Sequence, residues 1–235
     1  MIRELYNRLG SLSLGIWLMT GVIVLLVVGS FSGGGAESSS INDMPLFTWL
    51  KETPVASSWW LWLTIGLLAI LALNTVLCSI ESLRSKYGRA NFLSLIAPQV
   101  MHLSFLFIVL AHLLSAYGGL KGVIQVNEGE SVGFPDGTGV AIGNIAGQVG
   151  PMGMLTDYSA EVRYGTARGI ARQTISPNHP FFYQGFGIYL KDVQLSPQQI
   201  ALIEIHREPG AGFALAGALL FTVGNVVLLA VRRGR

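Results

Sequence analysis

Two histidines, His102 and His112, lie inside an otherwise uncharged apolar run, Phe92–Tyr117. An imidazole in hydrocarbon is energetically costly, so it usually faces a bundle interior, a polar cavity or a metal. Neutral imidazole is also the commonest metal ligand among side chains, through whichever ring nitrogen is free. The run therefore predicts a membrane-spanning helix with candidate ligands for haem iron or another metal.

The spacing of the two histidines limits what they can bind together. Ten residues separate His102 from His112, which is about 15 Å of helical rise and a rotation that leaves the two side chains roughly 80° apart. They cannot both ligate one metal. The alternatives to ligation are a helix–helix hydrogen bond for His102 and a polar position at the membrane surface for His112. One histidine fills one axial position of haem iron, so a second ligand must come from elsewhere.

No other group of residues predicts catalysis. Cys78 is the single cysteine, which excludes an intramolecular disulfide and a zinc cluster. His206 shares a predicted strand face with Glu204, so we expect it to face solvent and not to be a ligand. His179 lies in a turn between two prolines, where solvation is expected. The glycines at 137, 139 and 143 have loop spacing, and no helix follows to hold a phosphate.

Hydropathy predicts an integral membrane protein. The 235 residues are 51% hydrophobic and only 12% charged. A helix needs about 20 apolar residues to cross a bilayer core. The stretches that have this length and contain no Asp, Glu, Lys or Arg are Ser11–Ser30, Ser58–Ser79, Phe92–Tyr117 and Gly210–Val231. We interpret the first as a retained helix and not as a cleaved signal peptide.

Basic residues predict the orientation of these helices. Eight of the 15 lysines and arginines lie in three short segments before the first, between the second and third, and after the fourth helix. The positive-inside rule then places both termini and a basic loop at about 80–91 in the cytoplasm. These arginines determine topology, so no nucleic-acid partner is predicted. An outer loop at about 31–57 contains an amphipathic patch, Met44–Leu50, expected along the membrane surface.

Residues 118–209 have a different pattern, with glycines and turns between short alternating runs. These runs predict strands at Gly122–Val126, Ser159–Tyr164, Gly169–Ile175, Phe186–Val193 and Ile200–Arg207. The segment is expected to form a small extracytoplasmic β-sandwich or barrel between the third and fourth transmembrane helices. Residues 1–117 would hold three helices, and 210–235 the fourth helix with a basic cytoplasmic tail. In this last helix, small residues such as Gly210, Gly212 and Gly217 favour close helix packing.

One segment of the outer domain is a candidate docking surface. The turn Pro177–Pro180 leads into a predicted strand, Phe181–Tyr189, which combines aromatic rings with glycines. Glycine in a strand often marks a close backbone approach. Phe182, Tyr183 and Gly185 are therefore candidates for contact with a partner, and the alternative is core packing of the aromatic rings.

Several short motifs occur in an order that resembles the ResB (CcsB) family of cytochrome c biogenesis proteins. The motifs are Tyr6–Leu12 before the first helix, Pro45–Leu50, Leu73–Cys78 at the end of the second helix, Met101–Ser104 in the third, and Asp157–Val162 and Asn178–Tyr189 in the outer domain. Together with the four-helix layout, they run nearly end to end.

The resemblance implies one subunit of a membrane haem exporter and cytochrome c synthetase, which would not be catalytic alone. It implies that His102 is an axial ligand of a transported haem b, whereas His112 has no clear counterpart in the family. The implied partners are a multi-helix membrane protein of the ResC (CcsA) type, apocytochrome c and a thioredoxin-like thiol reductant. The implied location is the bacterial inner membrane, with the β-domain on the outer face.

Two functions from other classes stay open on the sequence. Two histidines at different depths are also compatible with a haem-b electron-transfer subunit of a quinone-linked complex. A third possibility is a structural membrane anchor without haem that presents a β-domain to a partner.

Overall fold

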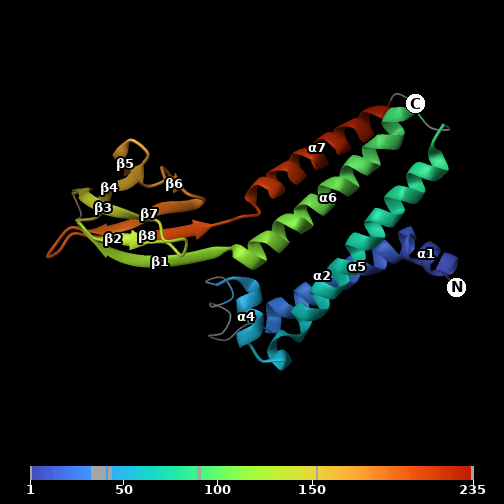
Figure 1. Ribbon diagram of the computed structural model, residues 1–235, viewed down its shortest axis with the longest axis horizontal. Coiled ribbons are helices and arrows are strands. Elements are labelled where there is room, and N and C mark those ends of the chain that lie inside the picture. Colours follow the sequence, from blue (N-terminus) through green and yellow to red (C-terminus); the bar gives the residue numbers. More distant parts are fainter. Residues whose placement is uncertain (1, 33–40, 42–43, 89–90, 152, 234–235) are drawn as a thin grey trace. The chain divides into compact units, whose positions relative to one another are not determined.

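The computed structural model describes residues 2–32, 41, 44–88, 91–151 and 153–233. The chain divides into two compact units, one made of residues 1–118 and 209–235 and the other of residues 119–208. The first unit is helical and the second is built from strands (Figure 1). The predicted basic residues Arg89 and Arg235 lie outside the described residues, as do residues 33–40 and 42–43 of the predicted outer loop.

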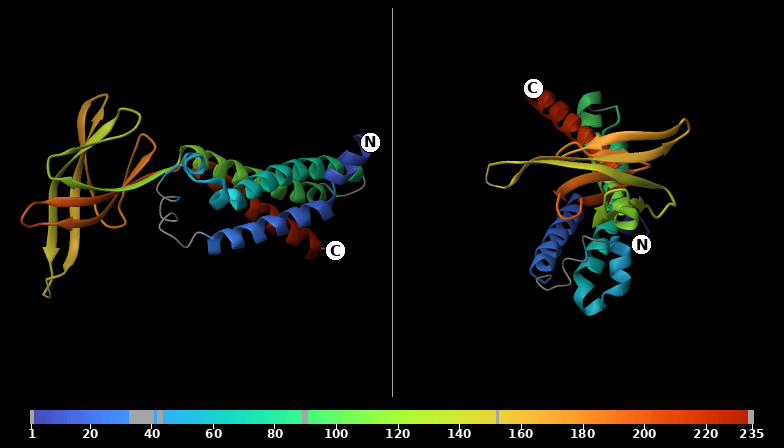
Figure 2. Two further views of the ribbon diagram at one scale, coloured as in Figure 1. Left: turned by 90° about the horizontal axis from the view of Figure 1, so that it is seen from below. Right: turned by 90° about the vertical axis from the view of Figure 1, so that its left-hand side faces the viewer.

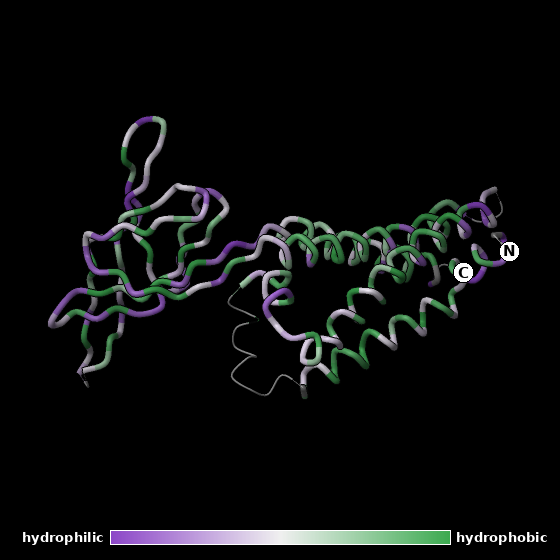
Figure 3. The backbone as a smooth tube through the Cα atoms, turned by 60° about the horizontal axis from the view of Figure 1, so that its bottom comes forward, coloured by the Kyte–Doolittle hydropathy of each residue, from purple (hydrophilic) through white to green (hydrophobic). Residues whose placement is uncertain are grey.

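The helical unit contains the four predicted apolar helices. Each is long and apolar enough to cross a membrane, and hydrophobic residues dominate along their length (Figure 3). The helices of this unit are α1 (Ile2–Leu9), α2 (Leu12–Ser32), α4 (Leu46–Glu52), α5 (Val55–Lys86), α6 (Phe92–Gly118) and α7 (Ala211–Arg233).

The predicted loop at 80–91 begins too early, because α5 continues as helix to Lys86. The residues after the apolar stretch include Leu83, Arg84 and Lys86, which are good helix formers, so charge ends the apolar stretch but not the helix. Gly88 follows at φ +71°. A left-handed glycine just beyond the last turn is a common helix terminator.

The long helices pack as two pairs, α2 along α5 and α6 along α7 (Figure 1). In the second pair, Gly210 and Gly217 meet the backbone of α6: a Cβ at Gly217 would lie 2.9 Å from the Ser104 carbonyl oxygen and 2.8 Å from the Ile108 side chain. Gly224, one heptad further along, faces Met101. Gly212 has no neighbour within 4 Å of its Cβ position. The small residues therefore form a seam, and Gly212 is not part of it.

The predicted amphipathic patch forms a short helix, α4, that packs against α5. Trp49 and Leu50 are buried, and they form a cluster with Leu61, Trp60 and Ile65 of α5. The apolar side of this patch is thus covered by protein.

The strand unit is a sandwich of two antiparallel sheets with four strands each. One sheet has the order β1-β8-β7-β6 and the other β2-β3-β4-β5, and their strands run across one another (Figure 2). The strands are β1 (Leu120–Asn127), β2 (Ser131–Gly133), β3 (Gly139–Val149), β4 (Leu155–Thr166), β5 (Gly169–Ile175), β6 (Phe181–Tyr183), β7 (Phe186–Gln194) and β8 (Ile200–Arg207).

One hydrophobic core lies between the two sheets. Phe186, Ile188 and Ile203 of the first sheet and Ile142 and Val162 of the second are almost completely buried. Burial of such side chains stabilises a fold by about 1.5–3 kcal/mol each. Alternation along the strands aims these residues inward, as the period of two in the sequence predicts.

Two expectations about this unit are wrong. Gly139 and Gly143 belong to strand β3 and not to a loop. The predicted strand Phe181–Tyr189 is a hairpin, in which β6 and β7 are joined at Gln184 and Gly185, with φ +49° and +82°. Two successive residues at positive φ are typical of a tight hairpin turn.

Candidate functional site

His102 lies on the face of α6 that contacts α5. Its Nδ1 is 2.7 Å from the hydroxyl oxygen of Ser79. That hydroxyl also lies 2.9 Å from the carbonyl oxygen of Thr75, one turn earlier in α5. His102 and Ser79 are both half-buried. The third predicted helix thus presents its histidine to the second helix, in a place where a polar group needs partners.

A second polar contact lies one helical turn away. Gln99 Nε2 donates to the hydroxyl of Ser82 over 3.2 Å. Residues three apart lie on the same face of a helix. The antiparallel helices α5 and α6 therefore make two successive polar contacts, Ser79 with His102 and Ser82 with Gln99. The Gln99 Oε1 atom is buried without a hydrogen-bond partner among the described residues. Such an orphaned buried acceptor is unusual in folded proteins, and each one needs an explanation.

The other ring nitrogen of His102 is open. Within the described part of the chain, Nε2 makes no hydrogen bond, and it is not among the fully enclosed side-chain atoms. A neutral imidazole held at Nδ1 and open at Nε2 has the form of a metal ligand. His102 could thus supply one nitrogen to a haem iron, and the other histidine of the helices is His112.

His112 does not join this site. Its side chain is exposed, and the described residues offer it no hydrogen bond. The ring lies more than two turns further along α6, as the spacing predicts. Two histidines on facing helices, which a four-helix b-type cytochrome needs for each haem, are not found among the described residues.

An ionic cluster on the outer face of the first sheet was not predicted. The side chain of Glu204 on β8 is only 5% exposed, and its carboxylate contacts Lys121 on β1, 3.2 Å away, and also Lys191 on β7 and His206. The strand face that Glu204 shares with His206, which was expected to be open to solvent at His206, is therefore covered at Glu204. A carboxylate this deeply buried requires such partners, because burial of an unpaired charge is very unfavourable.

His206 lies on the same face and is partly covered. Its side chain is 30% exposed, and Nε2 contacts the Glu204 carboxylate. The ring centroid is 5.0 Å from that of Tyr189. Burial lowers the pKa of His206, and the ammonium groups of Lys121 and Lys191 lower it further, while the Glu208 carboxylate opposes them. Because the two lysines also offset the charge of Glu204, a neutral imidazole is favoured.

The three candidate docking residues do not share one surface. Phe182 is 67% exposed, and its ring lies edge-on to Tyr189, 6.1 Å away. Tyr183, the next residue of β6, points the other way, where its ring lies 5.3 Å from Tyr164 and its hydroxyl donates to the Gly165 carbonyl. Gly185 forms the turn. Core packing holds for Phe181 and in part for Tyr183, and only Phe182 offers an apolar ring to a partner.

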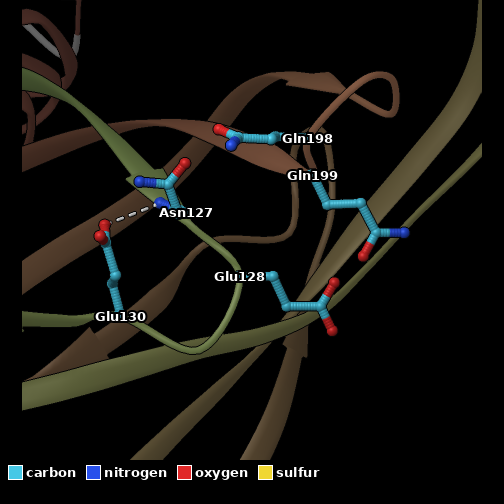
Figure 4. Close-up of a pocket in the computed structure, with 5 residues that line it drawn as sticks. All are labelled: Asn127, Glu128, Glu130, Gln198 and Gln199. Carbon is cyan, nitrogen blue, oxygen red and sulfur yellow. Dashed lines mark hydrogen bonds between the residues drawn. The ribbon is translucent and has the colours of Figure 1, made fainter.

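A polar groove at one end of the sandwich does not form a metal site. It is lined by Asn127, Glu128, Glu130, Gln198 and Gln199 (Figure 4). Glu130 accepts a hydrogen bond from the backbone of Asn127, and Glu128 accepts one from the backbone of Asn144. The two carboxylates point away from each other (Figure 4). Across the described residues, no group of three or more His, Cys, Asp or Glu side chains could hold a metal ion.

Three residues of these sites were missed in the sequence: Ser79, Gln99 and Glu204. Ser79 and Gln99 carry a detectable signal, because polar side chains three residues apart in each of two neighbouring apolar helices indicate facing polar stripes. Glu204 carries a weaker one, since alternation in a strand cannot tell a solvated carboxylate from one covered by lysines of the neighbouring strands.

Comparison with known proteins gives the family. The family model of the ResB-like family matches residues 81–202, just over half of the chain. The chain belongs to the ResB-like family. No curated protein sequence matches it.

A solved structure described as "Cytochrome c Heme Lyase CcmF" is similar at a TM-score of 0.47 and 14% identity. The similarity covers 87% of this chain and 34% of that one. The chain therefore spans about a third of the length of that structure.

Proposed function

We propose that this chain is a subunit of a membrane assembly for cytochrome c biogenesis, which carries haem b across the membrane and presents it to apocytochrome c. Membership of the ResB-like family supports this role. Four helices of transmembrane length and a β-rich unit between the third and fourth fit it as well.

The observation that carries the proposal is the state of His102. Its Nδ1 has a partner in Ser79, and its Nε2 has none among the described residues. An imidazole in an apolar helix with one open nitrogen is suited to bind iron axially. When haem is bound, its iron would take this nitrogen as one axial ligand. Ser79 orients the ring through its contact with Nδ1.

Among the described residues of the helical unit, the other histidine, His112, is exposed and lies more than two turns further along α6, so it does not serve as the second ligand at this site. We therefore assign the second ligand to a multi-helix membrane partner of the ResC (CcsA) type. On this view the chain is not catalytic alone, and thioether formation takes place in the complete assembly. A thioredoxin-like reductant would keep the cysteines of the apocytochrome reduced.

The orientation that suits this function has both termini in the cytoplasm of a bacterial cell and the β-rich unit outside the inner membrane. The basic residues of the termini and of the end of α5 support it. Phe182, the one exposed aromatic ring of the predicted docking segment, is our candidate contact for the partner or the apocytochrome.

Haem content of the purified protein tests the assignment of His102. We expect His102→Ala to remove most of the bound haem b and its Soret absorption from the chain isolated with its partner. His112→Ala is the matched control on the same helix, and it should leave haem occupancy unchanged because His112 lies outside the site. Unchanged occupancy and spectrum in His102→Ala would show that His102 is not the ligand.

A further inference from the structure

We infer that Ser79 is a positioning residue, which holds His102 with its proton on Nδ1 and so leaves Nε2 as the ligand atom. The ligand itself, haem iron, rests on the proposed function. The geometry that carries the inference is a chain of three groups, from the imidazole of α6 to the hydroxyl of Ser79 and on to the carbonyl of Thr75 in α5.

The hydroxyl of Ser79 has a single hydrogen and two close neighbours. Its oxygen is 2.9 Å from the Thr75 carbonyl oxygen and 2.7 Å from His102 Nδ1. A carbonyl oxygen can only accept, so the contact with Thr75 is a hydrogen bond only if Ser79 donates its hydrogen there. The lone pairs of Ser79 are then left to accept, and Nδ1 must be the donor. With the proton on Nε2 instead, Ser79 would have to donate to Nδ1, and two acceptor oxygens would face each other.

The other ring nitrogen leads to the same tautomer. Nε2 has no hydrogen-bond partner in the described part of the chain. A hydrogen on Nε2 would be a donor without a partner among the described residues, on a half-buried side chain of an apolar helix. A lone pair there is instead free for a metal. Both ends of the ring thus favour the same protonation.

The effect on iron binding follows from ligand chemistry. Partners that accept the second N–H of a ligating histidine fix the tautomer and raise the basicity of the ligand, and their loss lowers metal affinity about 10- to 100-fold. Ser79 is a neutral acceptor and not a carboxylate, so we expect the lower end of this range. A less basic imidazole also stabilises ferric iron less, so the midpoint potential of the bound haem should rise.

The tautomer can be measured without haem. The full chain, labelled with ¹⁵N-histidine and reconstituted in lipid nanodiscs, should show a pyrrole-type Nδ1 and a pyridine-type Nε2 for His102. Ser79→Ala should give a mixture of the two tautomers, and Ser79→Thr should restore the wild-type spectrum because it keeps the hydroxyl. Ser82→Ala is the matched control one turn away, since Ser82 contacts Gln99. A proton on Nε2 in the wild type, or an unchanged spectrum in Ser79→Ala, would overturn the inference.

A titration with ferric protoporphyrin IX in the same nanodiscs tests the consequence, with empty nanodiscs as the background. Ser79→Ala should bind about 10-fold more weakly and with a higher midpoint potential, while Ser79→Thr and Ser82→Ala stay near the wild type. If the porphyrin binds equally well to Ser79→Ala and to wild type through His102, the positioning role is refuted and the haem function stands. If no variant binds it through His102 while the tautomer shift is observed, the haem function fails and the role of Ser79 in the apo chain stands.

Discussion

The glycine seam between α6 and α7 yields a quantitative prediction, because the chain contains its own control. Gly217 faces α6, and a Cβ there would lie 2.9 Å from the Ser104 carbonyl oxygen and 2.8 Å from Ile108 Cγ1. A real Cβ is essentially never found at such a distance from a backbone atom, so the helices must separate. Gly212, five residues earlier in the same helix, has nothing within 4 Å.

The magnitude follows from the difference between the two sites. Replacing a helical glycine by alanine gains up to about 1 kcal/mol of helix propensity at either position. Overpacking adds a penalty of about 1–3 kcal/mol at Gly217 alone. Gly217→Ala should therefore be less stable than Gly212→Ala by about 1–3 kcal/mol, whatever the shared propensity term is in a membrane.

Gly224 provides a site of intermediate crowding between Gly212 and Gly217. Its Cβ position is 2.7 Å from Met101 Cγ and 3.3 Å from the Ala97 carbonyl oxygen. Met101 is a flexible side chain that can move aside, so Gly224→Ala should fall between the other two variants. The assay is unfolding of the purified chain in mixed micelles of increasing SDS fraction, followed by near-UV circular dichroism. Equal stability of Gly217→Ala and Gly212→Ala would refute the packing of α7 on α6 through this seam.

Three further predictions concern the other parts of the chain. Because the folded pKa of His206 is lowered below that of the unfolded chain, the unfolded state takes up more protons below about pH 6.5. The strand unit should thus lose stability as pH falls from about 6.5 through the lowered pKa of His206. His206→Gln should remove this pH dependence from the melting temperature measured by thermal unfolding. The charged groups around His206 are Lys121, Lys191, Glu204 and Glu208. Gly185→Ala, at φ +82°, should cost about 1–2 kcal/mol, whereas Gly122→Ala, with open space and no positive φ, should not. Topology can be tested in a Cys78→Ser chain with a membrane-impermeant maleimide. A cysteine introduced at exposed Arg168 should react in intact cells, and one introduced at Tyr87 should react only after lysis. The opposite pattern of labelling would show that the proposed topology is inverted.

The elements of this fold were predictable where a residue's own chemistry decides its place. Charge-free runs such as Phe92–Tyr117 gave the apolar helices, and period-two alternation gave strands such as Ile200–Arg207. Strand β3 was missed because Gly139, Gly143 and Gly147 interrupt the alternation and suggest turns. A glycine in this strand instead allows close packing, since a Cβ at Gly147 would lie 2.8 Å from the side chain of Leu155 in the paired strand.

The site was predictable only in part, because its partners are distant in sequence. The spacing within Phe92–Tyr117 identified His102, but the residue that sets its chemistry, Ser79, lies 23 positions earlier on another helix. The burial of Glu204 was not predicted, since a strand pattern records the face of a residue and not what covers that face. The lysines that cover it come from β1 and β7, whose register with β8 depends on the folded sheet.

The two polar contacts between α5 and α6 show what a sequence could still supply. Ser79 contacts His102, and Ser82, three residues later in α5, contacts Gln99, three residues earlier in α6. The two contacts therefore share one antiparallel register. A short connection between antiparallel helices fixes this register once a single contact is known. Given the contact of Ser82 with Gln99, this register therefore pairs Ser79 with His102. This register also places Gln99, whose buried Oε1 has no hydrogen-bond partner among the described residues, one turn from His102 on the face of α6 that meets α5.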